Sequence, residues 1–206
     1  KVLVDPFLTG NPVASVKADD VACDYILVSH AHGDHLGDAP SIAARTGAKI
    51  VSTPEVISVC ESQTLAEIAS CPMNIGGSLN LPFGKVRMTF AQHSAGVAGG
   101  IACGFVVYIG GRTVYYAGDT ALFSDMQLIG RKDSIDYAVL PIGDNYTMGL
   151  EDAAMAAQWV NAGHVIPVHY NTWPIIKQEA RHYKDVTEAM TRARVHIMAP
   201  GDTMEL

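Results

Sequence analysis

The chain has 206 residues, of which 49% are hydrophobic and 17% are charged, and its net charge is −7. This balance predicts one folded domain with a substantial core and excludes a disordered chain. The negative charge disfavours nucleic acid and anionic membranes as partners, and no apolar run has the length that spans a bilayer. The cysteines form no CxxC pair, so we expect reduced thiols and a cytoplasmic location rather than a disulfide framework.

Short apolar runs predict the strands of the domain. In chain order they are Val2–Val4, Tyr25–Ser29, Lys49–Ser52, Val86–Ala91, Ile101–Ile109, Thr113–Ala117, Tyr137–Ile142, Val165–Val168 and Val195–Met198. Helices are expected between them, over Ala39–Thr46, Glu55–Ala69, Leu122–Ile129, Glu151–Ala162 and Asp185–Ala193. The turn signal Gly110-Gly111 predicts a central hairpin, and Gly163 predicts the end of the preceding helix. Early strands, a hairpin and a late alternation of strand and helix indicate two packed sheets with helices outside.

The densest group of candidate ligands follows the strand Tyr25–Ser29. Between His30 and His35, three imidazoles and one carboxylate fall within six positions of the segment Ser29-His30-Ala31-His32-Gly33-Asp34-His35. Each is a good ligand for a divalent ion, and on extended backbone His30 and His32 project to the same side. Chance rarely places four ligands so densely. The pattern therefore favours a metal site over a polar loop whose imidazoles cap the backbone.

Three more candidate ligands each come just after a strand-like run. They are His93, Asp119 and His169. Alone, each histidine would more often be structural, and the aspartate, next to Gly118, would more often form a turn or a helix cap. Together with the first group they make seven ligands, which are too many for one tetrahedral ion and suit a pair. The histidines not assigned to the metal are His164, His182 and His196.

The chain resembles the metallo-β-lactamase superfamily, whose motif is His-x-His-x-Asp-His followed by His, Asp and His. More narrowly, it is similar to the small bacterial metal-dependent hydrolases grouped with the ascorbate-6-phosphate lactonases. The segments that carry this closer likeness are Asp5–Pro12, Pro141–Gly149 and His169–Pro174. The resemblance implies an α/β fold, the αββα sandwich of two mixed sheets, as one domain over residues 1–206. Such proteins usually begin with a further strand carrying a Gly-His pair, and we expect this domain to lack it.

The resemblance also implies a division of the ligands between two ions. The first ion is held by His30, His32 and His93, the second by Asp34, His35 and His169, and Asp119 bridges them. A water between two metals ionises near neutral pH, against about 15.7 for bulk water, and the hydroxide would attack a carbonyl or phosphoryl centre. Either Asp34 or a metal-bound water would relay the proton to the leaving group. We expect zinc or manganese, with nickel or iron as the alternatives.

Other residues at the same strand ends are candidates for supporting roles. Asp5 either orients a ligand imidazole or forms a turn before Pro6. The candidate substrate contacts are Asn171, Asn145, Tyr146 and Trp173, with Asn171 first among them. Trp173 is equally interpretable as part of a packed loop.

The favoured function is hydrolysis of a small anionic ester, in particular a lactone of a phosphorylated sugar-like molecule. The excess positive charge of two divalent ions over two carboxylates favours an anionic substrate. The alternative is a phosphodiesterase for a small or cyclic phosphodiester, whereas RNA is disfavoured by the absence of a basic stripe. Oxygen-reducing diiron proteins typically have Glu where His32 stands, and non-catalytic modules usually lose ligands. Apolar loops are compatible with a homo-oligomer.

Overall fold

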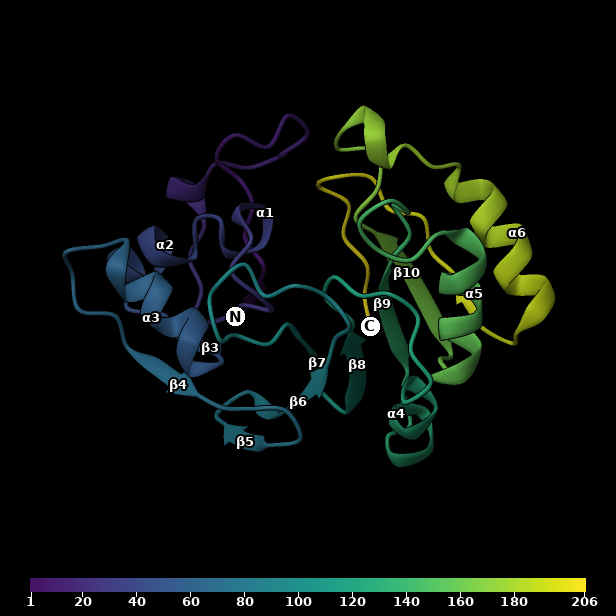
Figure 1. Ribbon diagram of the computed structural model, residues 1–206, viewed down its shortest axis with the longest axis horizontal. Helices are drawn as coiled ribbons and strands as arrows, with labels where there is room; N and C mark the ends of the chain where they lie inside the picture. The colour runs from purple at the N-terminus through teal and green to yellow at the C-terminus, as the bar shows by residue number, and fades with distance from the viewer.

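The computed structural model describes residues 1–206, which form two β-sheets packed face to face with helices on their outer sides (Figure 1). The four-stranded sheet has the order β1-β2-β3-β4 and comprises β1 (Val2–Val4), β2 (Tyr25–Leu27), β3 (Lys49–Ser52) and β4 (Ser70–Pro72). The seven-stranded sheet has the order β11-β10-β9-β8-β7-β6-β5 and comprises β5 (Ser78–Leu81), β6 (Gly84–Phe90), β7 (Cys103–Ile109), β8 (Arg112–Tyr116), β9 (Tyr137–Pro141), β10 (His164–Val168) and β11 (Arg194–Val195).

The helices lie in two groups, one beside each sheet. Those of the first half are α1 (Gly33–Leu36), α2 (Ala39–Thr46) and α3 (Pro54–Ser62), and those of the second half are α4 (Met126–Lys132), α5 (Leu150–Trp159) and α6 (Ala180–Met190). Two short 3-10 helices, η1 (Ala18–Asp20) and η2 (Pro174–Ile176), lie in loops. Figure 1 shows α2 and α3 beside β3, and α5 and α6 on the far side of the molecule beside β9 and β10. None of these helices is long and apolar enough to cross a bilayer.

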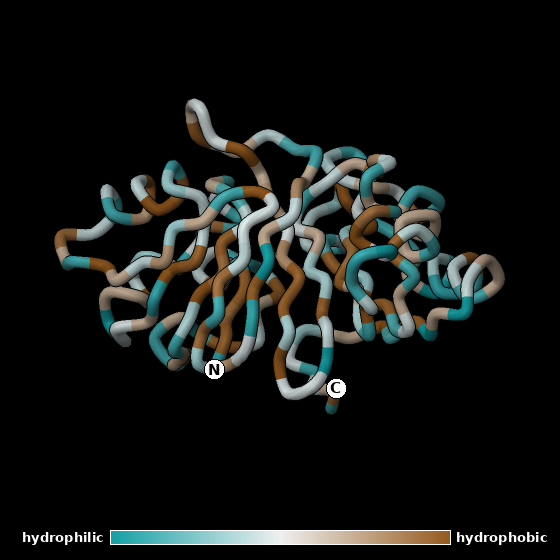
Figure 2. The backbone as a smooth tube through the Cα atoms, turned by 90° about the horizontal axis from the view of Figure 1, so that it is seen from below, coloured by the Kyte–Doolittle hydropathy of each residue, from teal (hydrophilic) through white to brown (hydrophobic).

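Three separate clusters of buried apolar side chains show the layering. One lies between the two sheets and includes Leu27, Met88 and Phe105. The neighbouring residue Ile26 belongs to a second cluster under α2 and α3, and Val106 to a third under α4, α5 and α6. Successive side chains of a strand point to opposite faces, so β2 and β7 are each buried on both sides. Figure 2 shows the resulting concentration of hydrophobic residues along the central strands. The predicted αββα sandwich is confirmed.

Strand direction brings the chemistry-bearing loops to one edge. Strands β1 to β4 are parallel, and β6, β8, β9 and β10 also share one direction, since β7 is antiparallel to both of its neighbours. The two sheets meet at this edge, where the Cys103 amide donates to the Ser29 carbonyl over 3.1 Å. Loops at the carboxyl ends of β1, β2, β6, β8 and β10 therefore converge.

Several predicted boundaries were wrong. The helix Glu55–Ala69 ends at Ser62, because the Thr64 hydroxyl accepts from the Ala66 amide and competes with the helix. The strands β4 and β5, which are three and four residues long, were missed in the segment that follows. The Gly110-Gly111 hairpin is confirmed, with both glycines at positive φ.

In the second half, α6 begins at Ala180, earlier than predicted, because its first turns are charged and bury only a few side chains, among them Tyr183. Helix α4 begins at Met126 instead of Leu122. The left-handed residue after α5 is Asn161, with φ 51°, and not Gly163.

Candidate metal centre

The seven predicted ligands come together in one cluster at the shared edge. Their ligand atoms form groups within 4.8 Å of one another, and two of these groups are His30, His32, His93 and Asp34, His35, His169. A third group contains Asp119 with one histidine from each of the others, namely His30 and His35. The aspartate thus lies between the two sets, which is the arrangement that the division into two ions requires.

Distances between the ligand atoms match those around a bound cation. His30 Nε2 lies 2.9 Å from His32 Nδ1, and His169 Nε2 lies 3.4 Å from Asp34 Oδ2. Asp119 lies 3.2 Å from His35 Nε2 and 3.3 Å from His169 Nε2. Ligand atoms about 2.0–2.1 Å from a tetrahedral zinc ion are separated by about 3.3 Å. The spacing of the donors therefore fits divalent ions.

Two buried polar atoms of the cluster lack hydrogen bonds. His35 Nε2 and Asp119 Oδ1 have no hydrogen-bond partner, although each faces the other across the cluster. An unsatisfied buried polar group costs about 1–3 kcal/mol, so native proteins rarely leave two side by side. A cation held between them would satisfy both, and we take this as the local evidence that the residues fit a metal.

Asp5 lies beneath the cluster and accepts four hydrogen bonds. Its Oδ2 accepts from His35 Nδ1 and the Tyr116 hydroxyl, both over 2.7 Å, and from the Ser29 hydroxyl over 2.6 Å. Its Oδ1 accepts from the Ser29 amide over 2.8 Å. Because an ionised carboxylate only accepts, the proton of His35 lies on Nδ1 and its Nε2 is directed to the metal position. Of the two interpretations of Asp5, the structure supports the orienting role.

The same carboxylate also fixes His30, through Ser29. The Ser29 hydroxyl donates to Asp5 and lies 2.9 Å from His30 Nδ1, so this nitrogen must carry the proton that it donates to Ser29. His30 Nε2 is then free to bind a cation. Neither Ser29 nor Tyr116 was identified from the sequence as a functional residue, although each immediately precedes or closely precedes a ligand.

Burial and the neighbouring charges set the protonation of the cluster. Burial, reinforced by the charge of His35, lowers the pKa of His30 to about 3, so the imidazole is neutral. Burial alone would lower the pKa of His35, but Asp5 and Asp119 raise it well above its usual value. Burial opposes ionisation of Asp119, but hydrogen bonding and charge from His35 lower its pKa. A metal binding at His35 would displace a proton, as expected for imidazole ligands.

Backbone geometry holds two of the ligands in place. Gly118 has φ +63°, and a Cβ there would lie 2.7 Å from the Cys103 carbonyl oxygen, so only glycine allows the turn before Asp119. His169 itself has φ 55° at the end of β10. A left-handed conformation at a residue other than glycine is uncommon and is often found at functional sites.

A cavity of about 740 Å³ opens over the cluster. Of the predicted substrate contacts, Tyr146 and Trp173 line it, together with the unpredicted Phe7, Ser94 and Ile175. Asn171 does not, because its side-chain oxygen accepts from the Gln178 amide over 2.8 Å and lies toward a different hollow. Asn145 is exposed and is not among the lining residues, and its amide binds the Asp144 carboxylate. The structure thus places two of the four at the site.

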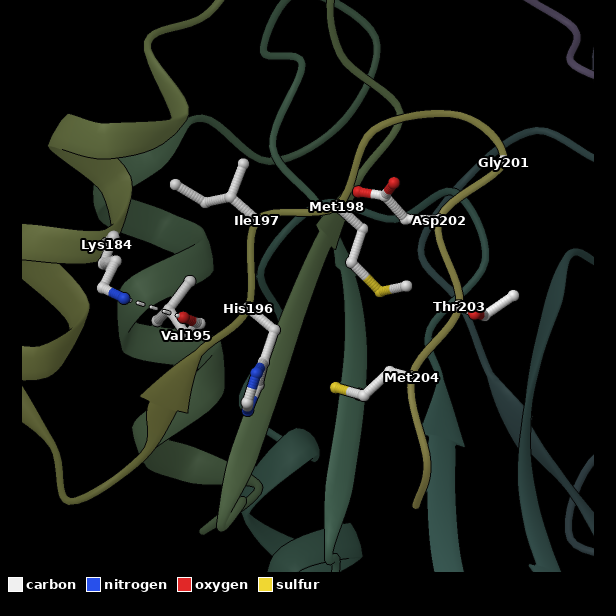
Figure 3. A pocket seen from close by; sticks show the side chains of 9 residues that line it. All are labelled: Lys184, Val195, His196, Ile197, Met198, Gly201, Asp202, Thr203 and Met204. Atoms are coloured by element: carbon white, nitrogen blue, oxygen red, sulfur yellow. Dashed lines mark hydrogen bonds between the residues drawn. The ribbon is translucent and has the colours of Figure 1, made fainter.

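A second cavity, of about 660 Å³, lies beside β11 and the C-terminal segment (Figure 3). His196 lines it and pairs with His164 Nδ1 over 2.8 Å, and Tyr137 stacks on the His164 ring. These residues belong to none of the groups of converging ligand atoms. His164 is at the opposite end of β10 from His169, so this cavity is separate from the metal centre.

Comparisons with known proteins agree with this geometry. The family model described as "Beta-lactamase superfamily domain" matches residues 1–170. A UPF0173 metal-dependent hydrolase of Pelotomaculum thermopropionicum is 49% identical, over 100% of this chain and 92% of that protein. Another, of Heliobacterium modesticaldum, is 48% identical, over 100% of this chain and 90% of that protein. The structure of Igni18, a metallo hydrolase from Ignicoccus hospitalis, has a TM-score of 0.90 and 35% identity, over 98% of this chain and 89% of that one.

These matches extend over most of the chain and include the strands that carry the seven ligands. The predicted membership of the superfamily is confirmed, and so is the prediction of a hydrolase that depends on a metal. The chain belongs to the metallo-β-lactamase superfamily, as a metal-dependent hydrolase related to the UPF0173 proteins.

Proposed function

We propose that the protein binds two divalent ions and hydrolyses a small ester or lactone. The first ion would be held by His30, His32 and His93, and the second by Asp34, His35 and His169, with Asp119 shared. The observation that carries this proposal is the position of Asp119. Its carboxylate lies 3.2 Å from His35 Nε2 and 3.6 Å from His93 Nε2, so one side chain reaches both groups.

The chemistry of the donors supports zinc or manganese. Five imidazoles with two carboxylates suit zinc, and mixed nitrogen and oxygen ligands also accept manganese, nickel or iron. Ions bound here would supply an attacking hydroxide near neutral pH and would polarise the carbonyl oxygen of the substrate.

The protein side chains would orient and transfer protons. Asp34 is the more exposed of the two ligand carboxylates and lines the cavity. Burial would raise its pKa, but the hydrogen bond from His169 and the charge of His35 lower it. Asp34 is therefore ionised, and its carboxylate is the group that we propose to take the proton of the attacking water and return it to the leaving group. Asp5 keeps the ligand imidazoles in position.

The lactonase assignment rests on the segments around Asp5, Asn145 and His169 and remains our proposal. The cavity lining contains no lysine or arginine, so it gives no support to the phosphorylated part of the expected substrate. Hydrolysis of a phosphodiester remains the alternative for the same ligand set.

The test compares zinc- and manganese-loaded protein on a simple lactone, a phosphorylated sugar lactone and a simple phosphodiester. Opening of either lactone, with the diester inert, would support acyl hydrolysis. Cleavage of the diester with both lactones inert would move the protein to the phosphodiesterases. Turnover without added metal, in protein treated with a chelator, would refute the proposal in either form.

A further inference from the structure

The wall of the cavity opposite the metal ligands is apolar. It is formed by Phe7, Tyr146, Trp173 and Ile175. The remaining lining residues are metal ligands, Gly33 and Ser94, and none is a lysine or arginine. Any negative group of a substrate would therefore have only the metal ions as its positive partners.

The wall is built from loops of both sheets. Phe7 follows β1, Trp173 follows β10, and their ring centroids are 5.8 Å apart, so the two halves of the molecule touch beside the cluster. Two apolar side chains remain exposed at the mouth: Ile175 is 57% and Tyr146 is 53% accessible. Large apolar residues that gather around a cavity commonly mark a ligand-binding surface.

Recognition of a phosphate in proteins typically uses arginine or lysine, which pair with its oxygens. This cavity offers rings and an aliphatic side chain instead. We propose that the substrate is an ester or lactone that carries an aliphatic or aromatic group and no phosphate. This inference rests on the proposed acyl hydrolysis. The apolar group packs on Phe7, Trp173 and Ile175, while the acyl carbon faces the ligand cluster.

The test compares δ-valerolactone with δ-decanolactone, which has the same ring and a five-carbon tail, using metal-loaded protein. Burial of one methylene corresponds to about a fourfold gain. We therefore expect kcat/KM to rise roughly 60-fold if three tail carbons are buried. Ile175→Ser should reduce the ratio of the two kcat/KM values at least fivefold. Leu128→Ser is the matched control, because Leu128 is 56% accessible and does not line the cavity.

A binding measurement separates this inference from the proposed function. Metal-free protein is titrated with each lactone while the fluorescence of Trp173 is followed, with Trp173→Phe identifying its signal. Saturable quenching that is tighter for δ-decanolactone supports the inference even if no lactone is opened, although the proposed function would then fail. Equal kcat/KM for both lactones, or a preference for a phosphorylated sugar lactone, would overturn the inference and leave acyl hydrolysis standing.

Discussion

Replacing Asp5 with asparagine would test how far one carboxylate organises both halves of the metal centre. The amide can place its oxygen at the Oδ2 position, where it keeps the bonds from Ser29, His35 and Tyr116, but its NH2 group then faces the Ser29 amide. The reverse orientation would leave three donors without an acceptor. The first orientation is therefore favoured, with one bond lost and three weakened.

The magnitude follows from these four bonds. A hydrogen bond to a charged group contributes about 1.5–3 kcal/mol and one to a neutral group about 0.5–1.5 kcal/mol, so three weakened bonds cost about 3 kcal/mol. The unsatisfied Ser29 amide adds about 1–3 kcal/mol. Loss of such an orienting partner typically lowers metal affinity 10- to 100-fold, which is about 1.4–2.7 kcal/mol. We expect both a less stable protein and weaker metal binding in Asp5→Asn.

The assay is a competition between the protein and a chelating dye for zinc, with the folded fraction measured by circular dichroism. Asp38→Asn is the control, because Asp38 accepts from the amides of Leu8 and Thr9 in the same loop and contacts no ligand. It should lower stability and leave zinc affinity unchanged. Tyr116→Phe is the milder variant if Asp5→Asn unfolds. Native zinc affinity in both Asp5→Asn and Tyr116→Phe would refute the role of this carboxylate.

Further variants test the ligands, the core and the thiols. His169→Ala should lose most turnover and weaken one of two metal equivalents, measured by metal analysis after dialysis, with the fold retained; full activity would contradict the assignment. Asp133→Ala leaves the buried Arg87 without its carboxylate partner and should cost about 3–5 kcal/mol in urea unfolding, whereas a loss under 1 kcal/mol would show that the pair contributes little. Burial raises the pKa of Cys60 to about 12, so at pH 8 its labelling by a thiol reagent should require unfolding; rapid labelling of the native protein would contradict this.

The layered fold could be predicted because the strands are buried on both faces and their apolar runs are therefore continuous. β2 and β9 illustrate this, since each was recognisable from composition alone. Where burial is one-sided or slight, the signal is weak. β4 contains Pro72 and only partly buried side chains, and the segment after α3 carries a fully exposed Leu65 that imitates an apolar helix face.

The metal ligands could be predicted because metal chemistry restricts the residue types that can serve. Substrate contacts have no such restriction, and their position depends on how a loop turns. Asn171 and Trp173 are two residues apart in one loop, yet only Trp173 lines the cavity. Asn171 has φ 61°, and its side chain is used to hold the Gln178 amide. Sequence gives the residues of such a loop but not the direction in which each of them points.

The turn at Asp5 links the organisation of the metal centre to the shape of the cavity. Asp5 has φ 42°, and its carbonyl accepts from the Phe7 amide over 2.9 Å, so the chain reverses within two residues after β1. The reversal leaves the carboxylate below the ligands and brings the Phe7 ring to the wall beside Trp173. A change in this backbone turn would therefore alter metal affinity and substrate preference together. Phe7→Leu, which leaves the turn in place, should change the lactone preference and leave zinc affinity at its native value.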